Sequence, residues 1–201
     1  MRHRYRLHMQ PVAVLESDRL RLRRAALSDA RPIFESYAQD PFVTRYLTWQ
    51  PLTSLQQAED FLVQVDRRWE DGESLAWTIS LATSNQLIGM IEARIDKHRV
   101  EVGYVLAQSA WGTGFATEAL QLVTAWALSQ PTIRCVWAYA DVDNLASIRV
   151  LEKAGLSRAG LLHSWARHPN VSDELRDCWV FSLSEDTAPE RATGSSRSRA
   201  T

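Results

Sequence analysis

Apolar and polar residues alternate in some stretches of the chain and recur at helical spacing in others, and these two patterns predict its elements. Residues 19–23 alternate strictly between arginine and leucine, which predicts a strand with the leucines facing the interior. Ser28 is expected to cap a helix that runs to about residue 39, with Pro32 tolerated in its first turn. After a loop punctuated by prolines, apolar residues at helical spacing predict a second helix over about residues 55–70.

The middle of the chain is rich in predicted strands, and strands alternate with helices in its last third. Short polar links join three strand-like runs, which predicts an antiparallel meander over residues 75–81, 86–95 and 100–106. There follow a glycine-containing loop, a helix, a strand at 133–140, a further helix, and strands near 156–167 and 174–183. Two opening helices, a mostly antiparallel sheet and one late strand–helix–strand unit indicate an α+β fold of about seven strands and four helices.

The 201 residues suit one domain with tails. Residues 1–14 are expected to form a flexible leader and residues 15–186 the folded domain. Residues 187–201 contain almost no large apolar side chain, so burial cannot offset their ordering entropy and a disordered tail is expected.

Charge and composition exclude several classes of protein. The formal charge of −1 argues against general nucleic-acid binding, so no DNA partner is expected. No apolar run approaches the ~20 residues of a membrane span, and the basic N-terminus lacks the apolar segment of a secretory signal, which favours a cytoplasmic protein without membrane contact. Cys135 and Cys178 are too few for a disulfide framework, and His163 and His168 have no companions at ligand spacing, so no metal is expected.

A glycine loop joins the end of the third meander strand to the start of the next helix. Gly112 and Gly114 allow the backbone to curl and a ligand to approach closely, and the first N–H groups of the helix have no partner inside it. This arrangement suits a phosphate or pyrophosphate, although a plain turn has the same pattern. The P-loop pattern is absent, and Thr117 stands where a dinucleotide-binding loop has its third glycine.

A second loop leads into the next helix. Asn144 has the position of an N-cap and Gly155 that of a left-handed stop, while Ser147 lies in the first turn. Asn144 is either a cap or a ligand contact, and the Ser147 hydroxyl either bonds the backbone or serves a ligand.

Five pieces occur in order over residues 17–183: Arg19-Leu20-Arg21-Leu22-Arg23, Ile88-Gly89, Glu101-Val102-Gly103-Tyr104, Trp111-Gly112-Thr113-Gly114-Phe115-Ala116-Thr117-Glu118-Ala119 and Asn144-X-X-Ser147-X5-Lys153-X-Gly155. Their ordered combination resembles the GNAT superfamily of acyl-CoA-dependent N-acetyltransferases, in particular the Rim-type branch that acetylates protein N-termini. One departure is Ser109, where the superfamily usually has Gln or Arg.

The resemblance implies a fold with two splayed strands that hold the pantetheine arm of acetyl-CoA, and direct attack of an amine on the thioester. Ser147 would lie near the thioester sulfur. The residues implied for cofactor binding are Tyr104, Val105, Leu106, Trp111, Gly112, Thr113, Gly114, Phe115, Ala116, Thr117, Asn144, Ser147 and Lys153.

Glu101 is the expected base, directly or through water, with Glu92 in reserve; a solvated strand carboxylate is the alternative for Glu101. An α-amino group of pKa near 7.8 is roughly 10–15% neutral at pH 7, whereas a lysine of pKa near 10.4 is below about 0.1% neutral. An N-terminal acceptor therefore needs only a modest base.

The acceptor site is expected to be lined by Trp49, Trp77, Glu92 and Trp165, with Tyr46 as a further candidate. A small amine such as an antibiotic, a polyamine or an amino acid is the alternative acceptor. A non-catalytic CoA-binding module and an adaptor that docks on RNA through the basic leader are the alternatives from other classes. A monomer or a homodimer is expected.

Overall fold

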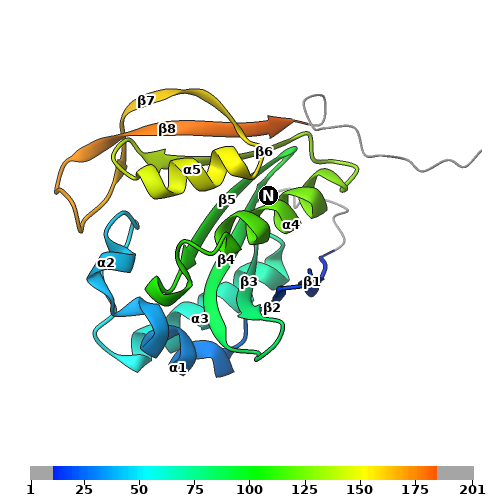
Figure 1. Ribbon diagram of the computed structural model, residues 1–201, viewed down its shortest axis with the longest axis vertical. Helices are drawn as coiled ribbons and strands as arrows, with labels where there is room; N and C mark the ends of the chain where they lie inside the picture. Colours follow the sequence, from blue (N-terminus) through cyan, green and yellow to red (C-terminus); the bar gives the residue numbers. More distant parts are fainter. Residues whose placement is uncertain (1–10, 185–201) are drawn as a thin grey trace, which may run out of the picture.

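The computed structural model of the protein describes residues 11–184, which form one mixed eight-stranded sheet with helices on both faces (Figure 1). The strands are β1 Val14–Glu16, β2 Leu20–Arg24, β3 Ser74–Leu81, β4 Leu87–Asp96, β5 Arg99–Leu106, β6 Cys135–Asp141, β7 Ser157–Arg167 and β8 Leu175–Ser184. They follow the spatial order β1-β2-β3-β4-β5-β6-β8-β7. Every neighbouring pair is antiparallel except β5 and β6, which are parallel.

In this described part of the chain, five α-helices accompany the sheet: α1 Ala30–Ile33, α2 Pro41–Thr44, α3 Leu55–Asp71, α4 Phe115–Leu128 and α5 Leu145–Lys153. α4 and α5 cover one face, and α1 and α3 cover the other, while α2 lies near the loop between β7 and β8 (Figure 1). The strand alternation places side chains in two cores, because successive residues point to opposite faces. Trp77 and Val100 pack towards α4, and Ala76 and Met90 pack towards α1 and α3.

The pairing between β5 and β6 is short. Arg99, Val100 and Glu101 pair with Cys135, Val136 and Trp137, and the register ends there. Residues 103–106 of β5 still pair with β4 on their other side. The two parallel strands therefore part after Glu101, which confirms the splayed pair that the resemblance implied.

The α+β class, the meander and the late strand–helix–strand unit are confirmed. The structure adds β1 and α2 to the elements expected from the sequence. β1 has three residues, too few for an alternation to show. α2 lies in the predicted loop, where the side chain of Asp40 accepts a hydrogen bond from the Phe42 N–H at 2.8 Å and Pro41 occupies the first turn.

Ser28 does not cap the first helix, which corrects the expectation. It lies in a 3-10 turn, Leu27–Asp29, which leads into α1 and then into a π-helical turn, Phe34–Ala38. The Asp29 carboxylate accepts the Ala26 N–H at 2.9 Å and binds Arg23 at 2.5 Å, so a contact with β2 sets where this segment begins.

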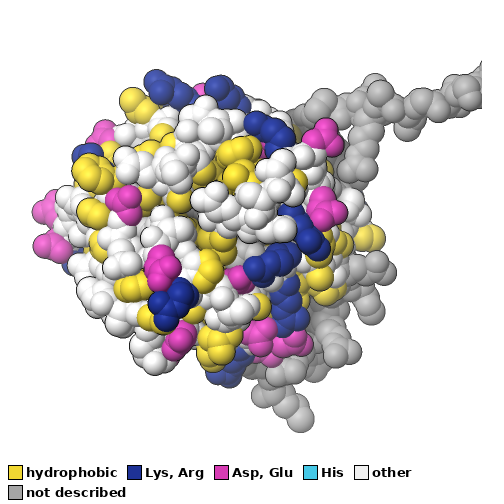
Figure 2. Space-filling model, turned by 60° about the horizontal axis from the view of Figure 1, so that its bottom comes forward, with side chains coloured by type: hydrophobic (Ala, Val, Ile, Leu, Met, Phe, Trp, Pro, Cys, Tyr) yellow, Lys and Arg dark blue, Asp and Glu magenta, His cyan; other side chains and the backbone are white. Residues whose placement is uncertain are grey.

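Most of the predicted leader and the whole predicted tail lie outside the described residues, and Val14, the last residue of that leader, begins β1. Within residues 11–184, no helix has the length and apolar character needed to cross a membrane. Acidic and basic side chains are interspersed over the face shown in Figure 2, in keeping with the formal charge of −1.

Candidate active site

The glycine loop between β5 and α4 has the backbone shape that the sequence predicted. Gly112 and Gly114 have φ values of 73° and 83°, in the left-handed region that side chains disfavour. The Glu118 N–H bonds the Gly114 carbonyl at 3.1 Å. The N–H groups of residues 115–117 precede this first bond of the helix, so they are free to bind an anion.

Arg19 anchors this loop from the start of β2. Its Nε donates to Glu118 Oε2 at 2.7 Å, and its Nη1 donates to the Thr113 carbonyl at 3.2 Å. The guanidinium also lies 4.8 Å from the centre of the Phe115 ring. Although partial burial tends to raise the pKa of Glu118, hydrogen bonds from Ser17 and Arg19 lower it below its ordinary value. Glu118 therefore stays ionised and holds the start of α4 in place.

The start of α5 is fixed by a cap and by an ion pair. Asn144 Oδ1 accepts the Ser147 N–H at 3.2 Å, as expected of an N-cap, and the Asn144 amide nitrogen takes no part in the cap. Arg176 binds both oxygens of the buried Asp141, at 2.5 and 3.0 Å, and also binds Asp143 at 2.6 Å. Burial tends to raise the pKa of Asp141, but the bonds from Arg176 outweigh it and lower this pKa.

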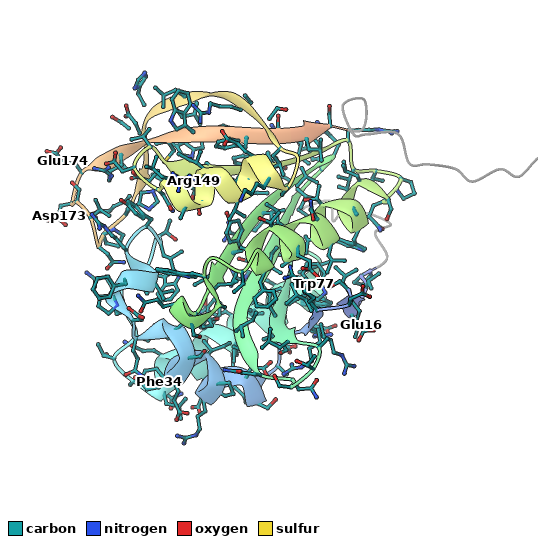
Figure 3. The ribbon with its side chains drawn as sticks, in the orientation of Figure 1. Glu16, Phe34, Trp77, Arg149, Asp173 and Glu174 are labelled. Carbon is teal, nitrogen blue, oxygen red and sulfur yellow. The ribbon has the colours of Figure 1, made fainter. Side chains whose placement is uncertain are left out.

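A cavity of about 510 Å³ lies between the glycine loop, β5, α5 and residues 42–47, which form most of α2 and the turn after it and are called the α2 segment. All the predicted cofactor-binding residues line it except Thr113, whose hydroxyl bonds the Ala110 carbonyl at 2.7 Å. The sequence analysis missed Arg45 and Arg149, which also line it; Arg149 extends from α5 in Figure 3. Arg149 lies one helical turn before Lys153, so the period of α5 could have indicated it.

This cofactor cavity fits acetyl-CoA in its chemistry. The glycine loop and the N-terminus of α4 suit a pyrophosphate, and Arg45, Arg149 and Lys153 supply positive charge around it. The gap between β5 and β6 exposes strand backbone to an extended arm. Among the described residues, no group of three or more His, Cys, Asp or Glu side chains is placed to hold a metal ion.

A second cavity, of about 460 Å³, lies on the other side of the splayed strands, next to α1, α3 and the loop after β7. The two cavities share six lining residues: Tyr46, Leu47, Tyr104, Val105, Asn144 and Ser147. At this junction the Tyr104 hydroxyl donates to Ser147 Oγ at 3.3 Å and lies 3.4 Å from the Ser147 carbonyl. Burial raises the pKa of Tyr104 to about 12, so the hydroxyl stays protonated at neutral pH.

Three charged side chains of β4 and β5, Glu92, Arg94 and Glu101, form a charged row in the second cavity. Arg94 Nη1 donates to Glu101 Oε1 at 2.5 Å, and Arg94 Nη2 lies 2.9 Å from Glu92 Oε2. Burial tends to lower the pKa of Arg94, but the two carboxylates outweigh it and raise this pKa. Glu101, the expected base, is therefore an ion-paired carboxylate at the cavity wall.

The structure supports only some of the expected acceptor residues. Trp49, Glu92 and Tyr46 line the second cavity. Trp77 is fully buried, with ring centres 5.4 Å from Trp69 and 5.3 Å from Trp126, and it belongs to the core beneath α4 (Figure 3). Trp165 lies on the edge strand β7, 47% exposed, and lines neither cavity. The expectations for Trp77 and Trp165 were therefore wrong.

The sequence also matches known proteins. The family described as "Acetyltransferase (GNAT) domain" matches residues 19–157. "Uncharacterized N-acetyltransferase YoaA" of Bacillus subtilis (strain 168) is 32% identical over 155 residues, which cover 76% of this chain and 87% of that protein. "Uncharacterized N-acetyltransferase p20" of Bacillus licheniformis is 29% identical over 174 residues, which cover 84% of this chain and 94% of that protein.

The fold is also similar to that of a solved structure, described as "RimL- Ribosomal L7/L12 alpha-N-protein acetyltransferase in complex with Coenzyme A". It superposes with a TM-score of 0.78 at 19% identity, covering 87% of this chain and 99% of that one. The family match spans most of the chain, and the cofactor cavity has the chemistry that such a family needs. The chain therefore belongs to the GNAT family of acetyl-CoA-dependent N-acetyltransferases.

Proposed function

We propose that this enzyme transfers the acetyl group to the α-amino group of a protein or peptide. The observation that carries the proposal is the meeting of the two cavities at Tyr104 and Ser147, with the ion-paired Glu101 on the acceptor side. The solved structure with a similar fold is described as an alpha-N-protein acetyltransferase, which supports the same class of acceptor.

Ser147 is the proposed proton donor to the leaving thiolate. Its Oγ accepts the hydrogen bond from Tyr104, so its own proton remains available to a group in the cavity. A thiol has a pKa of about 8.5, so the leaving group is only moderately basic and needs only moderate help from a proton donor. Tyr104 acts by orienting Ser147.

Glu101 is the proposed base, and an α-amino group is the acceptor that is easier for a carboxylate to deprotonate. Arg94 Nη1 occupies Oε1 of Glu101, which leaves Oε2 to accept a proton directly or through water. Deprotonating a lysine at neutral pH costs on the order of 3.5 kcal/mol more than deprotonating an α-amino group. A weak base is therefore sufficient for an N-terminus and poorly matched to a lysine.

A small amine is the second candidate acceptor, because the second cavity has the volume of a small-ligand pocket and a contact between two chain segments lies beside it. Asn170, in the loop between β7 and β8, donates through Nδ2 to the carbonyls of Thr44 and Trp49, both at 2.7 Å. These bonds join the two segments beside the cavity. Its volume of about 460 Å³ lies within the range of small-ligand pockets, roughly 300–1,000 Å³.

The test incubates the full chain with acetyl-CoA and three sets of acceptors, and follows the released thiol. The sets are peptides with a free N-terminus, the same peptides blocked at the N-terminus with one lysine, and small amines. We expect the highest kcat/KM for the free N-termini. Release with small amines alone would favour the second candidate, and no release with any acceptor, although acetyl-CoA binds, would contradict both.

Variants separate chemistry from cofactor binding. Ser147→Ala and Glu101→Gln are expected to lower kcat by about a hundredfold, the lower end of what general acid–base catalysis typically contributes, while acetyl-CoA still binds. Tyr104→Phe removes one neutral hydrogen bond and is expected to lower kcat about threefold to tenfold. Ser157→Ala, at an exposed position outside both cavities, is the matched control for Ser147→Ala. Full rates of Glu101→Gln across pH 6–9 would show that Glu101 is not the base.

A further inference from the structure

Arg68 lies at the wall of the second cavity with hydrogen-bonding capacity that the protein does not use. It projects from the last part of α3 into the cavity lining. Its Nε is buried and has no hydrogen-bond partner among the described residues. Its Nη1 lies 3.6 Å from Glu92 Oε1, which is an ion-pair distance but too long for a hydrogen bond.

The carboxylate nearest to Arg68 is already satisfied by other groups. Glu92 Oε1 accepts the Ser74 hydroxyl at 2.7 Å, and Glu92 Oε2 lies 2.9 Å from Arg94 Nη2. Arg94, in turn, binds Glu101 at 2.5 Å. The three side chains of the charged row thus bind one another, and Arg68 is a fourth charged group beside Glu92 that makes no hydrogen bond to them.

The Nε is enclosed by the protein, but the Arg68 side chain as a whole is 34% exposed, so its terminal nitrogens can donate to a ligand in the cavity. The planar donors of arginine match the two oxygens of a carboxylate better than any neutral group. Arg68 and Arg94 balance Glu92 and Glu101, and Asp141, the further carboxylate in the lining, is paired with Arg176. Addition of an ammonium group alone would leave the site positive, whereas an acceptor with both an amine and a carboxylate would keep it balanced.

We propose that Arg68 forms an anion subsite of the acceptor cavity, and that the preferred acceptor carries a carboxylate close to the amine that is acetylated. The inference rests on the proposed function and deepens it by naming a property of the substrate. The carboxylate belongs either to an acidic side chain at the first or second residue of a peptide or to a free amino acid. The acceptors chosen for the test distinguish these two sources.

The test uses acceptors matched in shape and different in charge. Peptides with Asp at the first or second residue are compared with the same peptides carrying Asn, and free aspartate is compared with its two monoamides. For the wild-type enzyme we expect the acidic member of a peptide pair to have a kcat/KM about tenfold to hundredfold higher, as for a hydrogen-bonded charge. A preference confined to the free amino acids would assign the carboxylate to that source.

Two substitutions on α3 provide the matched comparison. Arg68→Met removes the charge at the cavity, while Arg67→Met removes the same charge from the next residue, which is 85% exposed and lies 3.8 Å from Asp71. We expect Arg68→Met to reduce the acidic-to-neutral ratio of kcat/KM to near one and Arg67→Met to preserve it. Arg68→Lys keeps the positive charge but lacks the planar pair of donors of the guanidinium. It is expected to retain part of the acidic-to-neutral ratio of kcat/KM.

Equal rates for the acidic and neutral acceptors of the wild-type enzyme would overturn the inference and leave the proposed function standing. A ratio that survives Arg68→Met, or that falls equally in Arg67→Met, would also overturn it. If no acceptor releases thiol, the proposed function fails, and calorimetric binding of the same peptide pairs in the presence of CoA still decides the inference. Should Arg68→Met fail to fold, Arg68→Lys and the wild-type pairs carry the test.

Discussion

Replacing Arg19 by methionine removes the side chain that holds the glycine loop against the sheet. The change deletes the ion pair with Glu118, the hydrogen bond to the Thr113 carbonyl and the contact of the guanidinium with Phe115. Methionine keeps an apolar stem of similar length over the Phe115 ring. The substitution therefore perturbs the polar anchor of the loop while leaving its packing largely in place.

The size of the effect follows from the exposure of Arg19, whose side chain is 50% exposed. An exposed ion pair contributes about 0.2–1 kcal/mol, an exposed cation–π contact about 0.5–1 kcal/mol and one hydrogen bond about 0.5–1.5 kcal/mol. Some of this sum is lost to solvent screening, so about 1–2 kcal/mol remains. If the ordered loop is what binds the pyrophosphate, the Kd for acetyl-CoA rises about 5- to 30-fold.

Arg21 supplies the matched control because it lies two residues further along the same side of the chain and is 48% exposed. Its partner is Glu16 at 3.1 Å, away from the glycine loop. Calorimetric titration with acetyl-CoA and thermal unfolding are measured for Arg19→Met and Arg21→Met. Equal affinities for acetyl-CoA in the two variants would refute the reasoning, since both lose one half-exposed arginine and only one loses the loop anchor.

Two further predictions concern stability. A Cβ at Gly89 would lie 2.3 Å from the Val105 carbonyl oxygen, so Gly89→Ala is expected to lower the unfolding free energy by about 1–3 kcal/mol. Gly160→Ala is the control, because a Cβ at Gly160 meets no atom within 4 Å and should have little effect. Equal melting temperatures of the two variants would contradict this prediction. The pKa of Asp141 is lowered on folding, so its stabilisation is full above the unfolded pKa and is lost as the pH falls through the folded pKa. The melting temperature of Asp141→Asn should therefore lie below wild type at pH 7, with a difference that shrinks below about pH 4 and not above pH 7.

Local signals in the sequence predicted the two loops that matter for the cofactor. The glycines at 112 and 114 and the Asn144 cap act within a few residues, so their chemistry fixes the backbone wherever the loops lie. The family resemblance added what local signals cannot, the splay of β5 from β6. Arg45 was missed, and Tyr46 was expected only at the acceptor site, because both residues reach the cofactor cavity only through tertiary packing.

The predicted meander contained one signal that the sequence analysis did not use. Its turn after Asp96 places Arg94 directly opposite Glu101 in the register of β4 and β5. Opposite charges at such positions pair readily, so the ion pair of the expected base could have been derived by counting back from the turn. The position of Trp77, in contrast, could not have been predicted from the sequence. A tryptophan in an apolar strand has the same sequence pattern whether its side chain faces a cavity or the core.

Only three residue pairs join β5 to β6, so the described sheet consists of two parts of unequal size, here called panels, that are connected over a short stretch. β1 to β5 form one panel, and β6, β8 and β7 form the other. A cofactor in the gap would contact both panels and would therefore connect them where their strands do not pair. The opening that admits the cofactor is thus also the shortest pairing between two interior strands of the sheet.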